Sequence, residues 1–182
     1  AKLTEARAMM LKLFHQYTIL GYDLTLLEAQ KLVYFLQRFG ENLKLEYSKN
    51  YYGPFAQNLN HVLHVLDGHF LSGLKYKDAK PFDNLFIKEE RLSEIENFIN
   101  DYCSKVQKER LEKVSNLIEG FESPLGMELL ATVDFILTNY PETYNNQDNL
   151  VSKIHEWSKR KKELMKPEYI LTAYQRLTEY KD

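Results

Sequence analysis

Hydrophobic residues recur at helical spacing along most of the chain. Apolar positions three and four residues apart form stripes over residues 4–20 and 25–40. Similar stripes cover residues 91–120, 124–140, 150–164 and 167–180, although the middle of 91–120 is polar enough to permit a break. The pattern therefore predicts a mainly α-helical protein.

Local start and stop signals support several of these helices. Thr25 followed three residues later by Glu28 is a capping-box pattern. Ser123 followed by Pro124 is typical of an N-cap and a first helical position, and Pro167 is placed to begin the last helix. Residues 141–148 are polar and predict a loop.

Residues 51–73 predict the place where several elements meet. Gly53 allows a tight turn, and the fixed φ of Pro54 suits a first helical position, so we expect a helix to begin at Pro54. Its buried stripe would consist of Phe55, Leu59, Val62, Leu63 and Leu66. Asp67 and Gly68 would end this helix.

Two short segments predict a small amount of β-structure. Leu43, Leu45 and Tyr47 alternate with polar residues, which is the period of a half-buried strand. Residues 69–76 and 85–88 are β-prone and are separated by the turn-forming residues 78–81, so we expect a hairpin there. The expected fold class is a single helical domain, residues 1–182, with a small β-hairpin or short sheet.

Composition limits the classes of function. The formal net charge of −2 argues against a generally nucleic-acid-binding surface. Cys103 is the only cysteine, so an internal disulfide and a four-cysteine zinc site are excluded. The chain has neither a run of about 20 apolar residues nor a signal-peptide pattern, so we expect a cytoplasmic protein without a membrane partner. It begins with Ala1 rather than methionine, which predicts a piece of a longer protein.

The sequence offers little for catalysis, metals or cofactors. His61, His64 and His69 lie near Asp67, but the HExxH arrangement is absent and ordinary histidines explain the group. Cys103 has no nucleophile motif around it, and the scattered glycines form no phosphate-binding loop. We therefore expect no catalytic residues, no metal and no cofactor, although an enzyme that uses these histidines is kept as an alternative.

A second alternative is a DNA-binding regulator. Residues 28–66 can be read as helix, turn and helix, with residues 70–76 as the first strand of a wing. The candidate recognition helix, however, carries Asn and His where several Arg or Lys are expected. This alternative would use the helix from Pro54 and the basic run 159–162 to contact nucleic acid, although the run also suits a solvated face at the end of a helix, where it complements the negative dipole.

An acidic stretch gives a third candidate surface. Glu119, Glu122 and Glu128 flank Phe121, which we expect to be exposed, and the turn at residues 123–126. This pattern is typical of a solvated helix junction. It also suits a surface whose carboxylates imitate nucleic acid in front of a basic partner.

Three stretches resemble one known family over nearly the whole chain and in the same order. These are residues 24–73, which include KLVYF and YYGPF, residues 117–137 (LIEGFESPLGMELLATVDFIL) and residues 154–177 (IHEWSKRKKELMKPEYILTAYQRL). They resemble the C-terminal domain of the DarG antitoxin family. The first stretch is also more loosely similar in fold to Panacea antitoxin domains.

The resemblance implies a function. In the DarG family an N-terminal macrodomain removes ADP-ribose from DNA, and the C-terminal part binds DarT, a toxin that ADP-ribosylates thymidine in single-stranded DNA. This chain would then be a non-enzymatic inhibitor without the macrodomain, binding DarT 1:1 and blocking its DNA site by mimicry, with no nucleic acid bound directly. The partner-binding residues would be Glu119, Phe121, Glu122, Glu128 and Tyr52.

Overall fold

The computed structural model describes residues 1–74 and 79–181. Its elements, in chain order, are α1 (Glu5–Ile19), α2 (Leu26–Arg38), β1 (Ser48–Asn50), β2 (Gly53–Phe55), α3 (Gln57–Leu66), β3 (Leu71–Ser72), β4 (Phe86–Ile87), η1 (Glu89–Arg91), α4 (Leu92–Tyr102), α5 (Lys105–Leu117), α6 (Pro124–Asn139), η2 (Pro141–Asn145), α7 (Gln147–Trp157), α8 (Lys159–Leu164) and α9 (Pro167–Thr178). The expected fold class, a mainly helical domain with little β-structure, is confirmed. No helix within the described ranges is long and apolar enough to cross a bilayer.

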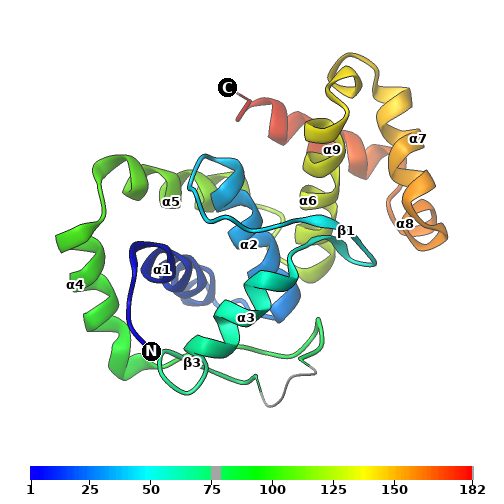
Figure 1. Cartoon of the computed structure of the whole chain (residues 1–182). Helices are drawn as coiled ribbons and strands as arrows, with labels where there is room; N and C mark the ends of the chain where they lie inside the picture. The colour runs from blue at the N-terminus through cyan, green and yellow to red at the C-terminus, as the bar shows by residue number, and fades with distance from the viewer. Residues whose placement is uncertain (75–78, 182) are drawn as a thin grey trace.

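Helices α2 and α6 pack together at the centre of the molecule. Figure 1 shows α1, α4 and α5 gathered on one side of this pair and α7, α8 and α9 on the other. A buried polar contact joins the two central helices: the Tyr34 hydroxyl donates to Asp134 Oδ2 at 2.7 Å, and Arg38 Nε donates to the same oxygen at 2.6 Å. The two central helices are therefore joined by a buried carboxylate whose hydrogen bonds are satisfied.

The predicted caps form. Thr25 Oγ1 accepts from the backbone N–H of Glu28, and the Glu28 carboxylate accepts from the backbone N–H of Thr25, which completes the capping box of α2. The Ser123 hydroxyl accepts from the N–H of Gly126 and caps α6, and Pro167 occupies the first turn of α9. The permitted break in residues 91–120 is confirmed, since Ser104 starts α5 with a second capping box.

The expected helix start at Pro54 is wrong. Gly53–Phe55 forms strand β2, which pairs antiparallel with β1 in the register Asn50 with Gly53, and α3 begins only at Gln57. The Gln30 side chain holds the next residue in an extended conformation, because its Nε2 donates to Ala56 O at 2.8 Å and its Oε1 accepts from Ala56 N at 3.1 Å. The side chain of a buried glutamine thus pairs with Ala56 as a strand partner would, and Ala56 becomes the N-cap of α3.

The strand predicted at residues 43–47 does not form, and strand pairing starts at Ser48. The predicted alternation of burial is nevertheless present, because Leu45 is buried between exposed Lys44 and Glu46. Leu45 pairs with a side chain rather than a strand: its N–H donates to Gln37 Oε1 at 2.9 Å, and Gln37 Nε2 donates to its carbonyl at 3.0 Å. Lys44 also has a φ of +58°, which interrupts an extended ladder.

Two further boundaries differ from the prediction. The hairpin over residues 69–88 is confirmed as β3 and β4 but is shorter, with Leu71 opposite Ile87; Tyr76 and Asp78 of that prediction lie outside the described residues. The predicted helix 150–164 is in fact α7 and α8, separated at Ser158, whose hydroxyl caps α8 by accepting from Lys161 N. The predicted loop 141–148 contains η2 and the start of α7.

Candidate functional site

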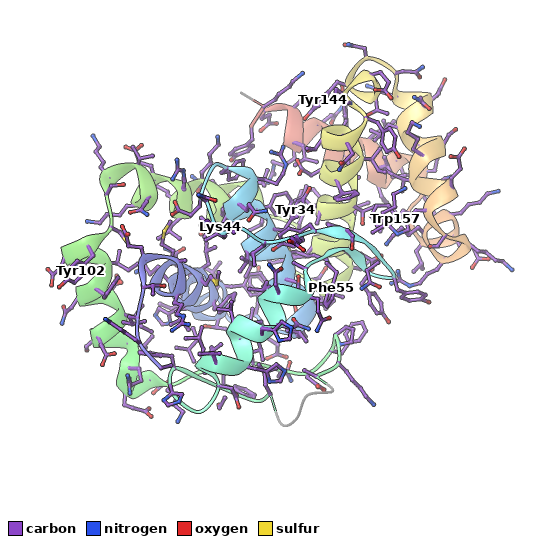
Figure 2. All side chains as sticks on the ribbon, in the orientation of Figure 1. Tyr34, Lys44, Phe55, Tyr102, Tyr144 and Trp157 are labelled. Carbon is purple, nitrogen blue, oxygen red and sulfur yellow. The ribbon has the colours of Figure 1, made fainter. Side chains whose placement is uncertain are left out.

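The β1–β2 hairpin, α2, α6 and α8 meet around the side chain of Glu128. Figure 2 shows Phe55 at the hairpin beside α3 and Trp157 at the end of α7. Trp157 Nε1 donates to the carbonyl of Asn50 at 2.9 Å, which ties α7 to the tip of the hairpin. The site is therefore assembled from segments that are far apart in the sequence.

Glu128 is buried and paired with two cations. Only 1% of its side chain is exposed. Arg160 donates to both carboxylate oxygens, at 2.7 and 2.9 Å, and Lys161 Nζ donates to Oε2 at 2.5 Å. Burial by itself raises the pKa of Glu128, but the hydrogen bonds from Arg160 and the charge of Lys161 outweigh it and lower the pKa. The carboxylate is thus held ionised inside the protein.

The basic run 159–162 is not the solvated end of a helix that the sequence suggested. It forms the first turn of the short helix α8, and Lys161 within it is fully buried. Lys161 Nζ also donates to the carbonyl of Tyr51 at 3.2 Å. Burial lowers the pKa of Lys161 although Glu128 acts in the opposite direction. Arg160 and Lys161 therefore attach α8 to α6, because both pair with Glu128. Lys161 also attaches α8 to the hairpin through the Tyr51 carbonyl.

Lys31 on α2 is a third buried cation beside this pair. Its Nζ donates to the carbonyl of Pro54 at 2.8 Å. Burial lowers the pKa of Lys31 to about 7; the charge of Lys161 acts in the same direction and that of Glu128 opposes it. We call Lys31, Glu128, Arg160 and Lys161 the ionic cluster. It fixes the hairpin through the two backbone carbonyls that its lysines bind.

Aromatic rings cover the outer side of the ionic cluster. The Arg160 guanidinium lies 4.8 Å from the ring centre of Tyr52 and 5.0 Å from that of Tyr51. Tyr52 makes edge contacts with Tyr51 at 4.7 Å and with Phe82 at 5.4 Å. Tyr51 and Phe82 are 55% and 54% exposed. We call Tyr51, Tyr52 and Phe82 the aromatic patch, and such groupings of Tyr and Arg are typical of binding hot spots.

A cavity of about 340 Å³ lies beside the aromatic patch. It is bounded by the hairpin, by α2 and by the first turns of α3. Its wall contains Leu26, Leu27, Gln30, Lys31, Asn50, Tyr51, Tyr52, Gly53, Phe55, Gln57, Asn60, Ala79 and Pro81. The predicted site residue Tyr52 is thus shared between the patch and the cavity.

The other predicted site residues lie at the junction of α5 and α6. The Glu119 carboxylate is exposed and has no hydrogen bond or ion pair with the described residues. Glu122 is half-buried, and its Oε1 accepts from the N–H of Gly120 at 2.6 Å. We call Glu119 and Glu122 the acidic junction. These two carboxylates remain available to solvent, whereas Glu128 is turned into the ionic cluster.

The expectation that Phe121 is exposed is wrong. Phe121 is 9% exposed, and the guanidinium of Arg176 lies 5.5 Å from the centre of the Phe121 ring. Arg176 also donates to the carbonyls of Leu117 and Glu119, at 2.8 and 2.6 Å. Arg176 of α9 therefore covers the aromatic ring and fixes the backbone of the acidic junction.

The histidines do not converge. His61 and His69 are exposed, and His69 Nδ1 contacts the amino group of Ala1 at 3.3 Å. Among the His, Cys, Asp and Glu side chains of residues 1–74 and 79–181, no group of three or more could hold a metal ion. Helices α2 and α3 are separated by the β1–β2 hairpin instead of a tight turn, so the helix-turn-helix of the DNA-binding alternative is not formed.

Sequence reasoning missed three members of the ionic cluster. Lys31 lies in a helix with few polar residues, where a charged residue at a buried position is a signal that could have been followed. Arg160 and Lys161 gave no such signal, because their burial depends on Glu128 more than thirty residues earlier.

Comparison with known proteins finds relatives that are much longer than this chain. A DNA ADP-ribosyl glycohydrolase from Thermus aquaticus is 39% identical over 160 residues, which cover 88% of this chain and 43% of the relative. Proteins of the same name from Mycobacterium bovis and Mycobacterium tuberculosis are each 28% identical over 154 residues, covering 83% of this chain and 43% of theirs. No family model matches the chain. The chain is therefore homologous to less than half of each of these proteins.

Proposed function

We propose that this chain is the toxin-binding domain of a DarG-type antitoxin and that it inhibits a DarT DNA ADP-ribosyltransferase by binding it 1:1. The observation that carries the proposal is the 39% identity over 88% of the chain to a DNA ADP-ribosyl glycohydrolase. It agrees with the resemblance of residues 24–73, 117–137 and 154–177 to the DarG C-terminal domain.

The hydrolase activity named in the relatives is assigned by this proposal to the portion that the chain does not cover. The chain matches only 43% of the Thermus aquaticus protein. On this view the domain has no catalytic residues and needs no cofactor, and its function is to occupy a surface of the toxin.

The acidic junction supplies the charge in the proposed mechanism. Glu119 and Glu122 would face basic toxin residues that otherwise hold DNA phosphates, so that the domain occludes the single-stranded DNA site by mimicry. Complementary charges of this kind speed association and make it sensitive to salt. Arg176 of α9 holds the backbone of the junction by donating to the Glu119 carbonyl.

Glu128 and Phe121 have supporting parts in this mechanism. Glu128 is neutralised by Arg160 and Lys161, so it would hold α8 and the hairpin in place rather than contact the toxin. Phe121 would stiffen the junction from within the core. Tyr52 would contribute from the aromatic patch, where its ring is partly exposed. The proposed contact residues are thus Glu119, Glu122 and Tyr52.

Co-purification with a catalytically inactive DarT tests the function. A stable complex is expected, and its absence with a folded domain contradicts the proposal. Gel shifts with operator DNA at moderate salt test the DNA-binding alternative, because non-specific phosphate binding weakens steeply there.

Charge reversal tests the surface. The double variant Glu119→Lys with Glu122→Lys should weaken toxin binding by about tenfold or more and reduce its salt dependence, as measured by calorimetry at two salt concentrations. The matched control is Glu89→Lys with Glu90→Lys, which changes the charge equally at two exposed positions of η1. Equal affinities for the two double variants would remove the acidic junction from the mechanism and leave the binding function intact.

A further inference from the structure

The cavity beside the aromatic patch has the size and lining of a small-molecule site. Its volume of about 340 Å³ lies at the lower end of the range for ligand pockets. Leu26, Leu27 and Phe55 give it an apolar side on which a ring can pack. Lys31, Asn50, Gln57 and Asn60 bring polar groups to the rest of the wall.

The amides of this wall present donors. Asn50 Oδ1 accepts from the N–H of Tyr51 at 2.7 Å, and Asn60 Oδ1 accepts from Gln30 Nε2 at 2.9 Å. Each asparagine therefore uses its oxygen within the fold and keeps its NH₂ group, which has no hydrogen-bond partner in residues 1–74 and 79–181. Gln57 at the rim is exposed and its side chain is likewise unpaired within these ranges. Acceptor groups on a ligand would satisfy these free NH₂ groups.

The charges around the cavity also favour an acceptor. Lys31 forms part of the wall, and its Nζ makes one hydrogen bond, to Pro54 O, so two of the three N–H groups of the ammonium remain. Lys31, Arg160 and Lys161 are grouped around the single carboxylate of Glu128. The ionic cluster is therefore short of negative charge, and burying an unbalanced charge is costly.

We propose that this cavity binds a small ligand that carries a carboxylate or phosphate group on a flat ring. The anionic group would face Lys31 and the amides of Asn50 and Asn60, and the ring would pack between Tyr52 and Phe55. This site does not depend on toxin binding, so either proposal can fail without the other.

The ligand should bind together with a proton. The pKa of Lys31 is lowered to about 7 by burial, with Lys161 acting in the same direction and Glu128 against it. An anion beside Lys31 favours its charged form and raises that pKa. Proton uptake at pH 7 and affinity that falls as the pH rises above 7 are the expected signatures.

Isothermal calorimetry with three probes tests the site. Adenosine monophosphate carries a ring and a phosphate, 4-hydroxyphenylacetate carries a ring and a carboxylate, and inorganic phosphate carries the anion alone. At least one of the two ring-bearing probes should bind about tenfold tighter than inorganic phosphate. The tighter-binding probe shows whether the site prefers a phosphate or a carboxylate. Titration at pH 7 in two buffers of different ionisation enthalpy measures the proton uptake. Failure of all three probes to bind at millimolar concentration overturns the proposal.

Variants locate the site. Lys31→Met should weaken binding at least about tenfold and abolish the proton uptake. Gln57→Glu places a negative charge at the exposed rim and should weaken binding without affecting the fold, which keeps the test decisive if Lys31→Met does not fold. Gln175→Glu, at an exposed position of α9, is the matched control and should bind normally. Unchanged affinity in a folded Lys31→Met variant and in Gln57→Glu would show that the probes bind elsewhere.

Discussion

Replacement of Glu128 by glutamine removes the only carboxylate of the ionic cluster while keeping the shape of the side chain. Arg160 is 22% exposed in its side chain and can be hydrated after the loss, but Lys161 is fully buried and cannot. Removing one partner of a buried ion pair typically costs about 3–5 kcal/mol, because the other charge is left uncompensated. We expect the lower end, about 3 kcal/mol, since Lys161 keeps its hydrogen bond to Tyr51 O.

Thermal and urea unfolding measure this loss. For a chain of this size, about 3 kcal/mol corresponds to a fall in melting temperature of roughly 6–12 °C. Glu112→Gln at an exposed position of α5 is the matched control and should change the free energy of unfolding by less than about 0.5 kcal/mol. Combining Glu128→Gln with Lys161→Met should recover much of the loss, because the uncompensated charge is then removed.

The pH dependence gives an independent check on the charge. The pKa of Glu128 is lowered from its ordinary value of 4.5, so the stabilisation by its carboxylate is fully present above pH 4.5 and is lost as the pH falls through the lowered pKa. The difference between wild type and Glu128→Gln should shrink as the pH falls below 4.5, because the carboxylate is then protonated. If the free energies of unfolding of Glu128→Gln and wild type differ by less than about 1 kcal/mol at pH 7, the variant does not leave Lys161 as a buried charge without a partner, and the reasoning is refuted.

Three further changes test other parts of the fold. In wild type the free energy of unfolding should rise by roughly 2 kcal/mol between pH 7 and 9, because the unfolded state binds more protons than a folded state with a Lys31 pKa near 7. Lys31→Met should remove most of this rise, and urea unfolding at both pH values measures it. Gly53→Ala should destabilise more than Gly120→Ala in thermal unfolding, since both have positive φ but only at Gly53 would a Cβ atom approach Thr132 Oγ1 to 2.9 Å. Thr25→Ala should cost about 1 kcal/mol in urea unfolding through loss of the capping box.

The helix starts that sequence reasoning predicted correctly are those whose chemistry is local. Thr25 caps α2 through a residue three positions away, and Ser123 caps α6 in the same way. These signals depend on the hydroxyl and the nearby backbone alone, so the rest of the fold does not alter them. The break before Ser104 was predicted only as permitted, because a polar helix surface and a true interruption look alike in the sequence.

The start of α3 was missed because a distant residue decides it. The fixed φ of Pro54 suits an extended segment as well as a first helical turn. Gln30, on another helix, selects the extended form by hydrogen bonding both backbone groups of Ala56. In the same way Gln37 binds the backbone of Leu45 and prevents a strand there. Periodicity cannot reveal that a buried amide will replace a strand or helix partner.

The predicted carboxylate surface was only partly correct, again because a distant part of the chain decides the outcome. Glu119, Glu122 and Glu128 look equivalent along the chain, but Arg160 and Lys161 withdraw Glu128 from the surface. The acidic residues left exposed at the junction are supported by α9 through Arg176, whereas the aromatic patch is supported by α6 and α8 through Glu128.

The two parts of the proposed toxin surface are therefore held in place by different side chains. Lys161 binds the Tyr51 carbonyl and Arg160 lies over the Tyr52 ring, so a change at Glu128 reaches the surface through the hairpin. Among the described residues Glu119 shares no hydrogen bond or ion pair with that cluster, and effects at sites without shared partners generally add. Loss of binding on charge reversal of the acidic junction therefore reports on charge complementarity, and loss on disturbing Glu128 reports on the position of the aromatic patch.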